Sequence, residues 1–294
     1  MPKMNCRPPV TWLCAALLIL VSSAHSLAAQ QNNPPLTSYY GTTPVLDGVI
    51  SPGEWDDATQ FAGVKDWWPA FHPVTNDRDL SLKGYVKHDS KYLYFAADVT
   101  DDLLYGIATP RYLPPSNPKA HELTREGYPW LGDEMEILLF AGPSPPRLEA
   151  DGTGSSWQMV CNLTKSRAGG VGVGGILEGE PRSKASAWET YQKWIEDGAQ
   201  RCAAKVKPDG SGYILEWAIR FDRCLEMDPG VFYSPAQGRA VVRIKLVLGD
   251  MDRPEDGAAN RYLFHHEQWF APGAVPAERR AWGYLHLMGM ERKP

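Results

Sequence analysis

Three acidic residues stand close together at the start of a strand-like run: Asp133, Glu134 and Glu136. Enzymes that hydrolyse glycosidic bonds place two carboxyl groups about 5–10 Å apart around the bond. Because side chains alternate along a strand, Glu134 and Glu136 would share one face, and Asp133 would lie on the other. Hydrolysis of O-glycosyl bonds is therefore kept as an alternative function. The sequence adds neither a nucleophile elbow nor a zinc motif to support it.

The elements that must position these acids are strands. Apolar residues at every second position predict two hairpins, 80–87 with 92–99 and 199–207 with 213–221. Further strands are predicted at 134–140, 156–163, 240–248, 261–265 and 282–287. With so many strands and few helices, the chain is predicted to be all-β, an antiparallel β-sandwich of jelly-roll or immunoglobulin-like type. Proline- and glycine-rich stretches at 104–128 and 166–197 predict long loop insertions.

The first 28 residues have the features of an export signal. Lys3 and Arg7 give a positive start, an apolar run extends from Trp12 to Val21, and Ser26-Leu27-Ala28 has the small-x-small form of a cleavage site. The run is shorter than the roughly 20 apolar residues of a membrane-spanning helix. We therefore expect a cleaved signal peptide rather than an anchor, and a secreted or periplasmic protein without membrane contact after cleavage.

The remaining chain has the composition of a globular domain, with 43% hydrophobic and 22% charged residues. We predict a polar, proline-containing lead segment at 29–43 and one sandwich domain at 44–290, since there is neither an internal repeat nor a clean linker. The net charge of −5 gives no broad attraction to phosphate backbones. Nucleic acid is therefore not an expected partner.

Three of the five cysteines lie outside the signal: Cys161, Cys202 and Cys224. An odd number in an exported protein allows one disulfide and one free thiol. Cys161 and Cys202 both fall in strand-like runs, which favours a disulfide between these two.

Five segments in order carry a family resemblance. The first, Pro44–Ala58 (PVLDGVISPGEWDDA), has a hydrophobic-Asp-Gly turn and then an acid–Trp pair, in which we expect Trp55 to pack in the core. The others are YLYFAADVTDD at 92–102, PWLGDEMEI at 129–137, YILEWAI at 213–219 and WGYLHL at 282–287. Together they resemble the family 9 carbohydrate-binding modules over about Pro44 to Leu287. The resemblance implies a binding module rather than an enzyme, which takes plant-type polysaccharide or its chain ends and supports polysaccharide catabolism alongside glycoside hydrolases such as xylanases.

The resemblance also implies which residues bind the ligand. Trp130 matches the family's stacking Trp, and sugar rings pack their C–H bonds on such aromatic faces; the alternative is a core residue at the end of the sheet. Glu136 matches an acid that accepts hydrogen bonds from sugar hydroxyls, and Asn162 matches a site Asn. Trp269 lies where the family has a more structural Trp and is the fourth candidate.

Two parts of the family's site differ in this chain. The second stacking Trp has no equivalent, because 272–280 contains no aromatic residue. The family's site Arg falls on Met159 or Val160, and its site Gln falls near Val247. A different glycan, or an interaction module with no sugar affinity, is therefore an alternative.

Family modules often hold structural calcium, which prefers several oxygen ligands. The acidic turn with Asp98, Asp101 and Asp102 is the candidate metal site, together with the turn Asp250-Met251-Asp252. The alternative is that both turns are simply solvated.

A last alternative comes from related sandwiches of the DOMON kind, which bind haem through Met and His or Lys. Met135, Met159 and His265 could supply such ligands. A methionine on a strand is more often a core residue, however.

Overall fold

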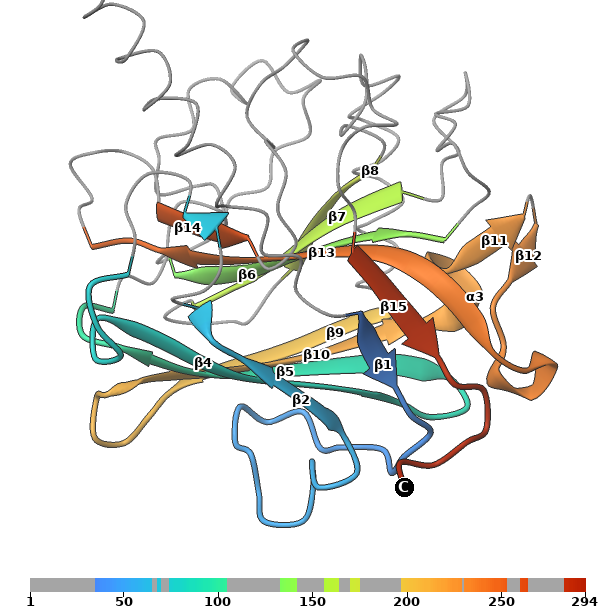
Figure 1. Ribbon diagram of the computed structural model, residues 1–294, viewed down its shortest axis with the longest axis horizontal. Coiled ribbons are helices and arrows are strands. Elements are labelled where there is room, and N and C mark those ends of the chain that lie inside the picture. The colour runs from blue at the N-terminus through green and yellow to red at the C-terminus, as the bar shows by residue number, and fades with distance from the viewer. Residues whose placement is uncertain are drawn as a thin grey trace, which may run out of the picture. The chain divides into compact units, whose positions relative to one another are not determined.

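The computed structural model describes residues 35–64, 68–69, 74–104, 133–141, 156–163, 170–174, 197–228, 230–252, 260–263 and 283–294 (Figure 1). The chain divides into two compact units, Met1–Asn32 and Asn33–Pro294, and the described residues belong to the second. The predicted signal peptide lies outside them. Among the described residues no helix is both long and apolar enough to cross a membrane.

Two β-sheets form the fold, which confirms the all-β sandwich (Figure 1). Sheet A has the order β1 (Leu36–Ser38), β15 (Gly283–Leu287), β13 (Ala240–Asp250), β6 (Glu134–Phe140), β7 (Ser156–Asn162) and β8 (Gly170–Gly174). Beyond this path, β14 (Asn260–Leu263) pairs with β13, and β3 (Trp68–Pro69) pairs with β14. Sheet B has the order β2 (Thr59–Ala62), β4 (Leu80–His88), β5 (Tyr92–Asp101), β10 (Gly212–Arg220) and β9 (Gln200–Val206). The strand pairs are antiparallel except β1 with β15.

Short elements follow β10. They are α3 (Phe221–Cys224), the two-stranded ribbon of β11 (Glu226–Asp228) and β12 (Val231–Phe232), and the 3-10 turn η7 (Pro235–Gln237).

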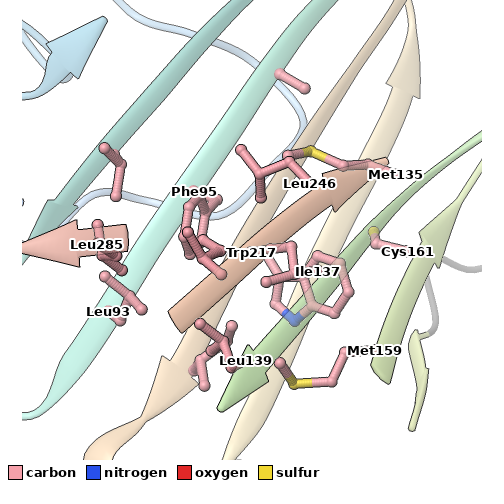
Figure 2. Close-up of a cluster of buried hydrophobic side chains, with 14 of the residues drawn as sticks. Leu93, Phe95, Met135, Ile137, Leu139, Met159, Cys161, Trp217, Leu246 and Leu285 are labelled. Carbon is pink, nitrogen blue, oxygen red and sulfur yellow. The ribbon is translucent and has the colours of Figure 1, made fainter. Parts of the chain in front are cut away.

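Both predicted hairpins are confirmed, β4 with β5 and β9 with β10. Their inward-facing side chains meet those of sheet A in one buried apolar cluster (Figure 2). Sheet A contributes Ile137 and Leu246 to this cluster, and sheet B contributes Phe95 and Trp217. Burial of apolar surface at about 25 cal/mol per Å² is the main force that holds the two sheets together.

Three strands of sheet A were not predicted: β1, β8 and the two-residue β3. β1 lies within the segment assigned as a lead, and it pairs in parallel with the last strand. The sandwich therefore begins before Pro44. β8 consists of GVGVG, and glycine is ordinarily depleted in strands, so its sequence gave no strand signal.

The outer face of sheet B carries a second buried cluster, around Trp55. Trp55 packs there as expected, 2% exposed, with its indole 5.9 Å from the ring of Tyr85. Its Nε1–H donates to Oε1 of Glu216 on β10. The other carboxylate oxygen of Glu216 accepts the backbone N–H groups of Asp47 and Gly48 at 2.9 and 2.7 Å. The Asp-Gly turn, the acid–Trp pair and the strand with a single Glu therefore meet at one carboxylate.

His88, at the end of β4, connects the two ends of the described chain. Its Nε2 lies 2.7 Å from the carbonyl oxygen of Gly289, and its Nδ1 lies 2.8 Å from Oγ of Ser38. A carbonyl can only accept, so Nε2 carries the hydrogen and the neutral ring accepts from Ser38 at Nδ1. Burial lowers the pKa of His88, which favours this neutral form.

Candidate functional site

The face of sheet A that points away from the core carries charged residues. On β6, Met135, Ile137 and Leu139 belong to the core cluster, so the alternating Glu134 and Glu136 lie on the opposite face. Glu136 is nevertheless only 1% exposed. Glu136 is therefore not the solvated strand residue that was the alternative, and a carboxylate buried to this degree needs polar neighbours, because burying it without them is costly.

The strand register places Glu136 and Asn162 on adjacent strands. Asn162 is paired with Glu134, and Glu136 is paired with Val160 on β7 and with Val247 on β13. Asn162 is thus a diagonal neighbour of Glu136, and period-two alternation assigns both positions to one face. Trp130 and Trp269 lie outside the described residues, as does the side chain of Asn162.

Lys245 is a further charged residue of this face, and it was not among the predicted site residues. It is paired with Leu138 on β6, one diagonal step from Glu136, and it is 3% exposed. The signal was present in the sequence, since Arg243 and Lys245 alternate with the core residues of β13. A strand with one apolar face and two cations on the other predicts a charged sheet face.

The chemistry of this face suits a neutral polyhydroxylated ligand. A carboxylate accepts hydrogen bonds from hydroxyl groups, and an ammonium group donates to hydroxyl oxygens. Such charge-assisted hydrogen bonds are roughly twice as strong as neutral ones. Glu136 and Lys245 offer both kinds of partner within one diagonal step of the sheet.

Acidic residues gather at the other notable place, where strands of both sheets end. Asp101, Asp133 and Asp250 bring carboxylate oxygens within 4.8 Å of one another, and all three residues are buried. Asp79, Asp102 and Asp252 form a second group with the same spacing and more exposure. The two turns predicted as separate candidates therefore meet, and Asp79 and Asp133 join them.

The buried group closes one end of the hydrophobic core. Asp101 continues the core-facing row of β5 and Asp250 that of β13, while Asp133 precedes Met135 on β6. Asp133 also binds neighbouring backbone, since its Oδ1 accepts the N–H of Met251 at 3.0 Å and its carbonyl accepts the N–H of Leu163 at 2.8 Å. The group thus joins β5 of sheet B to β6 and β13 of sheet A.

Several buried atoms of this group and of the neighbouring Tyr213 lack a hydrogen-bond partner. They are Oδ2 of Asp101, Oδ1 of Asp250 and the hydroxyl of Tyr213, and the two aspartates are 1% and 2% exposed. Burial, followed by the charge of Asp252, raises the pKa of Asp101 to about 7. Burial, followed by the charge of Asp101, raises the pKa of Asp250 to about 9. Crowded carboxylates with unused oxygens are unfavourable unless a cation or protons compensate them.

A hard divalent cation fits this donor set. The donors are all oxygens, which calcium prefers at 2.3–2.6 Å, so two ligands on opposite sides of the ion would lie about 4.8 Å apart. In each acidic group the carboxylate oxygens lie within 4.8 Å of one another, so they are close enough to share one ion.

Asp98, the other predicted metal ligand, lies apart from both groups. It stands three residues before Asp101 on β5, so it occupies the other face of the strand. There Oδ1 of Asp98 forms an ion pair with Nζ of Lys207 at 2.6 Å.

Cys161 and Cys202, predicted to form a disulfide, come together between the sheets. Both are free thiols in the structure, Cys161 buried on β7 and Cys202 half-buried on β9. The disulfide stays a prediction.

The methionines considered as haem ligands are core residues. Met135 and Met159 are buried in the cluster between the sheets (Figure 2). The amide of Gln200 contacts the sulfur of Met159. His265 lies outside the described residues.

Comparison with known proteins gives structural relatives only. No family model and no curated protein matches the sequence. A family 9 carbohydrate-binding module from Caldicellulosiruptor kristjanssonii in complex with cellotriose is similar, with a TM-score of 0.50 and 14% identity over 86% of this chain and 93% of that chain. Its complex with glucose gives a TM-score of 0.50 and 13% identity over 86% and 95%. A protein from Bacteroides uniformis for which carbohydrate binding has been suggested gives 0.50 and 11% over 87% and 100%. At these identities the likeness establishes the fold, which is that of family 9 carbohydrate-binding modules.

Proposed function

We propose that this protein binds carbohydrate on the outer face of sheet A. The observation that carries the proposal is the pair of buried charged residues, Glu136 and Lys245, on neighbouring strands of that face. The fold supports it, because the similar modules were solved with cellotriose and glucose. Trp130, six residues before Glu136, would supply the stacking surface.

The proposed setting is extracellular or periplasmic. The N-terminal segment 1–28 has the features of an export signal. A module of this kind would hold a polysaccharide chain while a separate glycoside hydrolase cleaves it. The ligand class we propose is plant-type polysaccharide or its chain ends.

Affinity electrophoresis tests the proposal directly. The protein is run in native gels containing soluble β-glucan or xylan, and calorimetry follows with cellotriose and glucose. We expect retardation of the wild type, its loss in Trp130→Ala and its weakening in Glu136→Gln. Asp98→Asn, on sheet B, is the matched control, and glycan should retard it as much as the wild type relative to a gel without glycan. Absence of retardation with every glycan, or unchanged retardation of Trp130→Ala, would refute carbohydrate binding at this face.

We propose, as a second property, that the two acidic groups at one end of the core bind calcium. We call this part of the molecule the acidic end. The support is the set of unpartnered, buried oxygens on Asp101 and Asp250. Asp101, Asp133 and Asp250 would hold an inner ion, and Asp79, Asp102 and Asp252 an outer one. A bound dication would neutralise the buried charge and tie β5 to β6 and β13.

A further inference from the structure

We infer that Cys161 and Cys202 form a disulfide that joins sheet A to sheet B, and that external oxidants reach this pair through Cys202. This inference is independent of the proposed sugar and calcium binding. It rests on described residues of β7 and β9.

Strands β7 and β9 contact each other through their core-facing side chains. Gln200 on β9 reaches the sulfur of Met159 on β7, and both residues are buried. Two residues further along each strand stand Cys202 and Cys161, on the same faces as Gln200 and Met159. Cys202 packs against the cluster that contains Cys161.

Their surroundings make the two thiols unequal. Cys161 is fully buried, and its hydrogen bond with Cys202, together with burial, raises its pKa well above the usual range. Cys202 is half-buried, so it is the sulfur that an external reagent can meet first. Accessible thiols react before buried ones.

The reaction balances with a small-molecule disulfide as the oxidant. The Cys202 thiolate attacks one sulfur of that disulfide, which forms a mixed disulfide and releases one thiol. Cys161 then loses its proton and attacks Sγ of Cys202, which forms the protein disulfide and releases the second thiol. Two protein thiols are oxidised, and one external disulfide is reduced to two thiols.

A disulfide here would add a covalent link between two sheets that are otherwise joined by packing and by hydrogen bonds such as that of Ser38 with His88. Disulfides between facing sheets occur in immunoglobulin domains, where a buried Trp packs against the bridge. Here Trp217 is paired with Cys202 in the register of β10 and β9, and it is 2% exposed. The closed loop from 161 to 202 would restrict the unfolded chain and raise the melting temperature by about 10 °C.

The test equilibrates the full chain in buffers of increasing oxidised-to-reduced glutathione ratio. Free thiols are then blocked by alkylation, and the linked peptides are mapped by mass spectrometry without reduction. We expect a Cys161–Cys202 peptide and the rise in melting temperature in the wild type and in Cys224→Ser. Cys202→Ser should show neither. Cys161→Ala should stop at a glutathione adduct on Cys202.

Three outcomes would overturn the inference. One is that Cys161 and Cys202 are both alkylated in excess oxidised glutathione. Another is that a link to Cys224, Cys6 or Cys14 forms in place of the expected one. The third is that the wild type stops at the mixed disulfide on Cys202.

Discussion

The indole N–H of Trp55 donates a hydrogen bond to the carboxylate of Glu216 across 3.2 Å, although the two residues lie 161 positions apart. With the backbone N–H groups of Asp47 and Gly48, it brings three donors to one buried acid. This arrangement fixes the segment Pro44–Ala58 on the outer face of sheet B.

The first prediction concerns this acceptor. In Glu216→Gln an NH₂ group replaces one of the accepting oxygens, so at least one buried N–H loses its partner. The expected loss in the free energy of unfolding is about 1–3 kcal/mol, measured by urea denaturation. Glu291→Gln, at an exposed ion pair with Arg239, is the control and should cost less than about 1 kcal/mol. Equal losses in the two variants would contradict the role of Glu216.

The second prediction is a pH dependence of the same residue. Burial, opposed in part by the backbone hydrogen bonds of Gly48 and Asp47, raises the pKa of Glu216 from 4.5 to about 7. Between these values the folded protein binds more protons than the unfolded chain, so this residue's contribution to stability falls as pH rises. The wild type's unfolding free energy relative to that of Glu216→Gln should therefore fall between pH 4.5 and 7, by up to about 1.4 kcal/mol per pH unit. Denaturation series at pH 5, 6 and 7 measure this, and a flat difference would contradict it.

The third prediction concerns the acidic end of the core. Calcium at one hundred times its dissociation constant should stabilise the wild type by about 2.7 kcal/mol. This is measured as the rise in melting temperature when calcium is added back to protein that was first stripped with EGTA. With a pKa of about 9, Asp250 must be protonated on folding at neutral pH when calcium is removed, which costs free energy. Asp250→Asn removes that cost, so it should melt higher than the wild type in EGTA and should gain less from calcium. Asp98→Asn should respond to calcium like the wild type. A calcium response that survives unchanged in Asp250→Asn would exclude Asp250 as a ligand.

The fourth prediction concerns Lys245. Lys245→Met keeps the length of the side chain but removes the ammonium donor, so glycan affinity should fall about 10-fold to 100-fold. Calorimetry with the best-bound glycan measures the change. The exposed Lys205→Met on β9 is the control and should bind as the wild type does. If Lys245→Met folds normally and binds equally well, Lys245 has no part in the site.

The sequence was sufficient to predict the elements whose structure depends on a local pattern of residues. Alternating apolar residues predicted both hairpins, and the spacing of Asp98 and Asp101 could have placed them on opposite faces of β5. The pattern was insufficient for β8, whose glycines have no apolar side chain to alternate. It was also insufficient for the meeting of Asp133 with Asp101 and Asp250, because that contact depends on how two sheets are stacked.

The candidate site was predicted in part. Family resemblance pointed to Glu136, and strand pairing explains why Asn162 lies beside it. Lys245 was not predicted because the family's Gln corresponds to a position near Val247, two residues further along the same face of β13. The register of strand pairing, which brings together positions far apart in sequence, placed Lys245 and Asn162 next to Glu136; the local sequence pattern does not contain this information.

The hydrogen bonds that His88 forms with Ser38 and Gly289 have a mechanical consequence. Ser38 and Gly289, which both bind this ring, mark where the polypeptide enters and leaves the sandwich, while Asp79 immediately precedes the opposite end of β4. A strand of that length spans about 30 Å. A flanking domain attached to either side would therefore pull on the same corner. The pull would act at the His88 end of β4, whereas Asp101, paired with Leu80, lies at the other end of that strand.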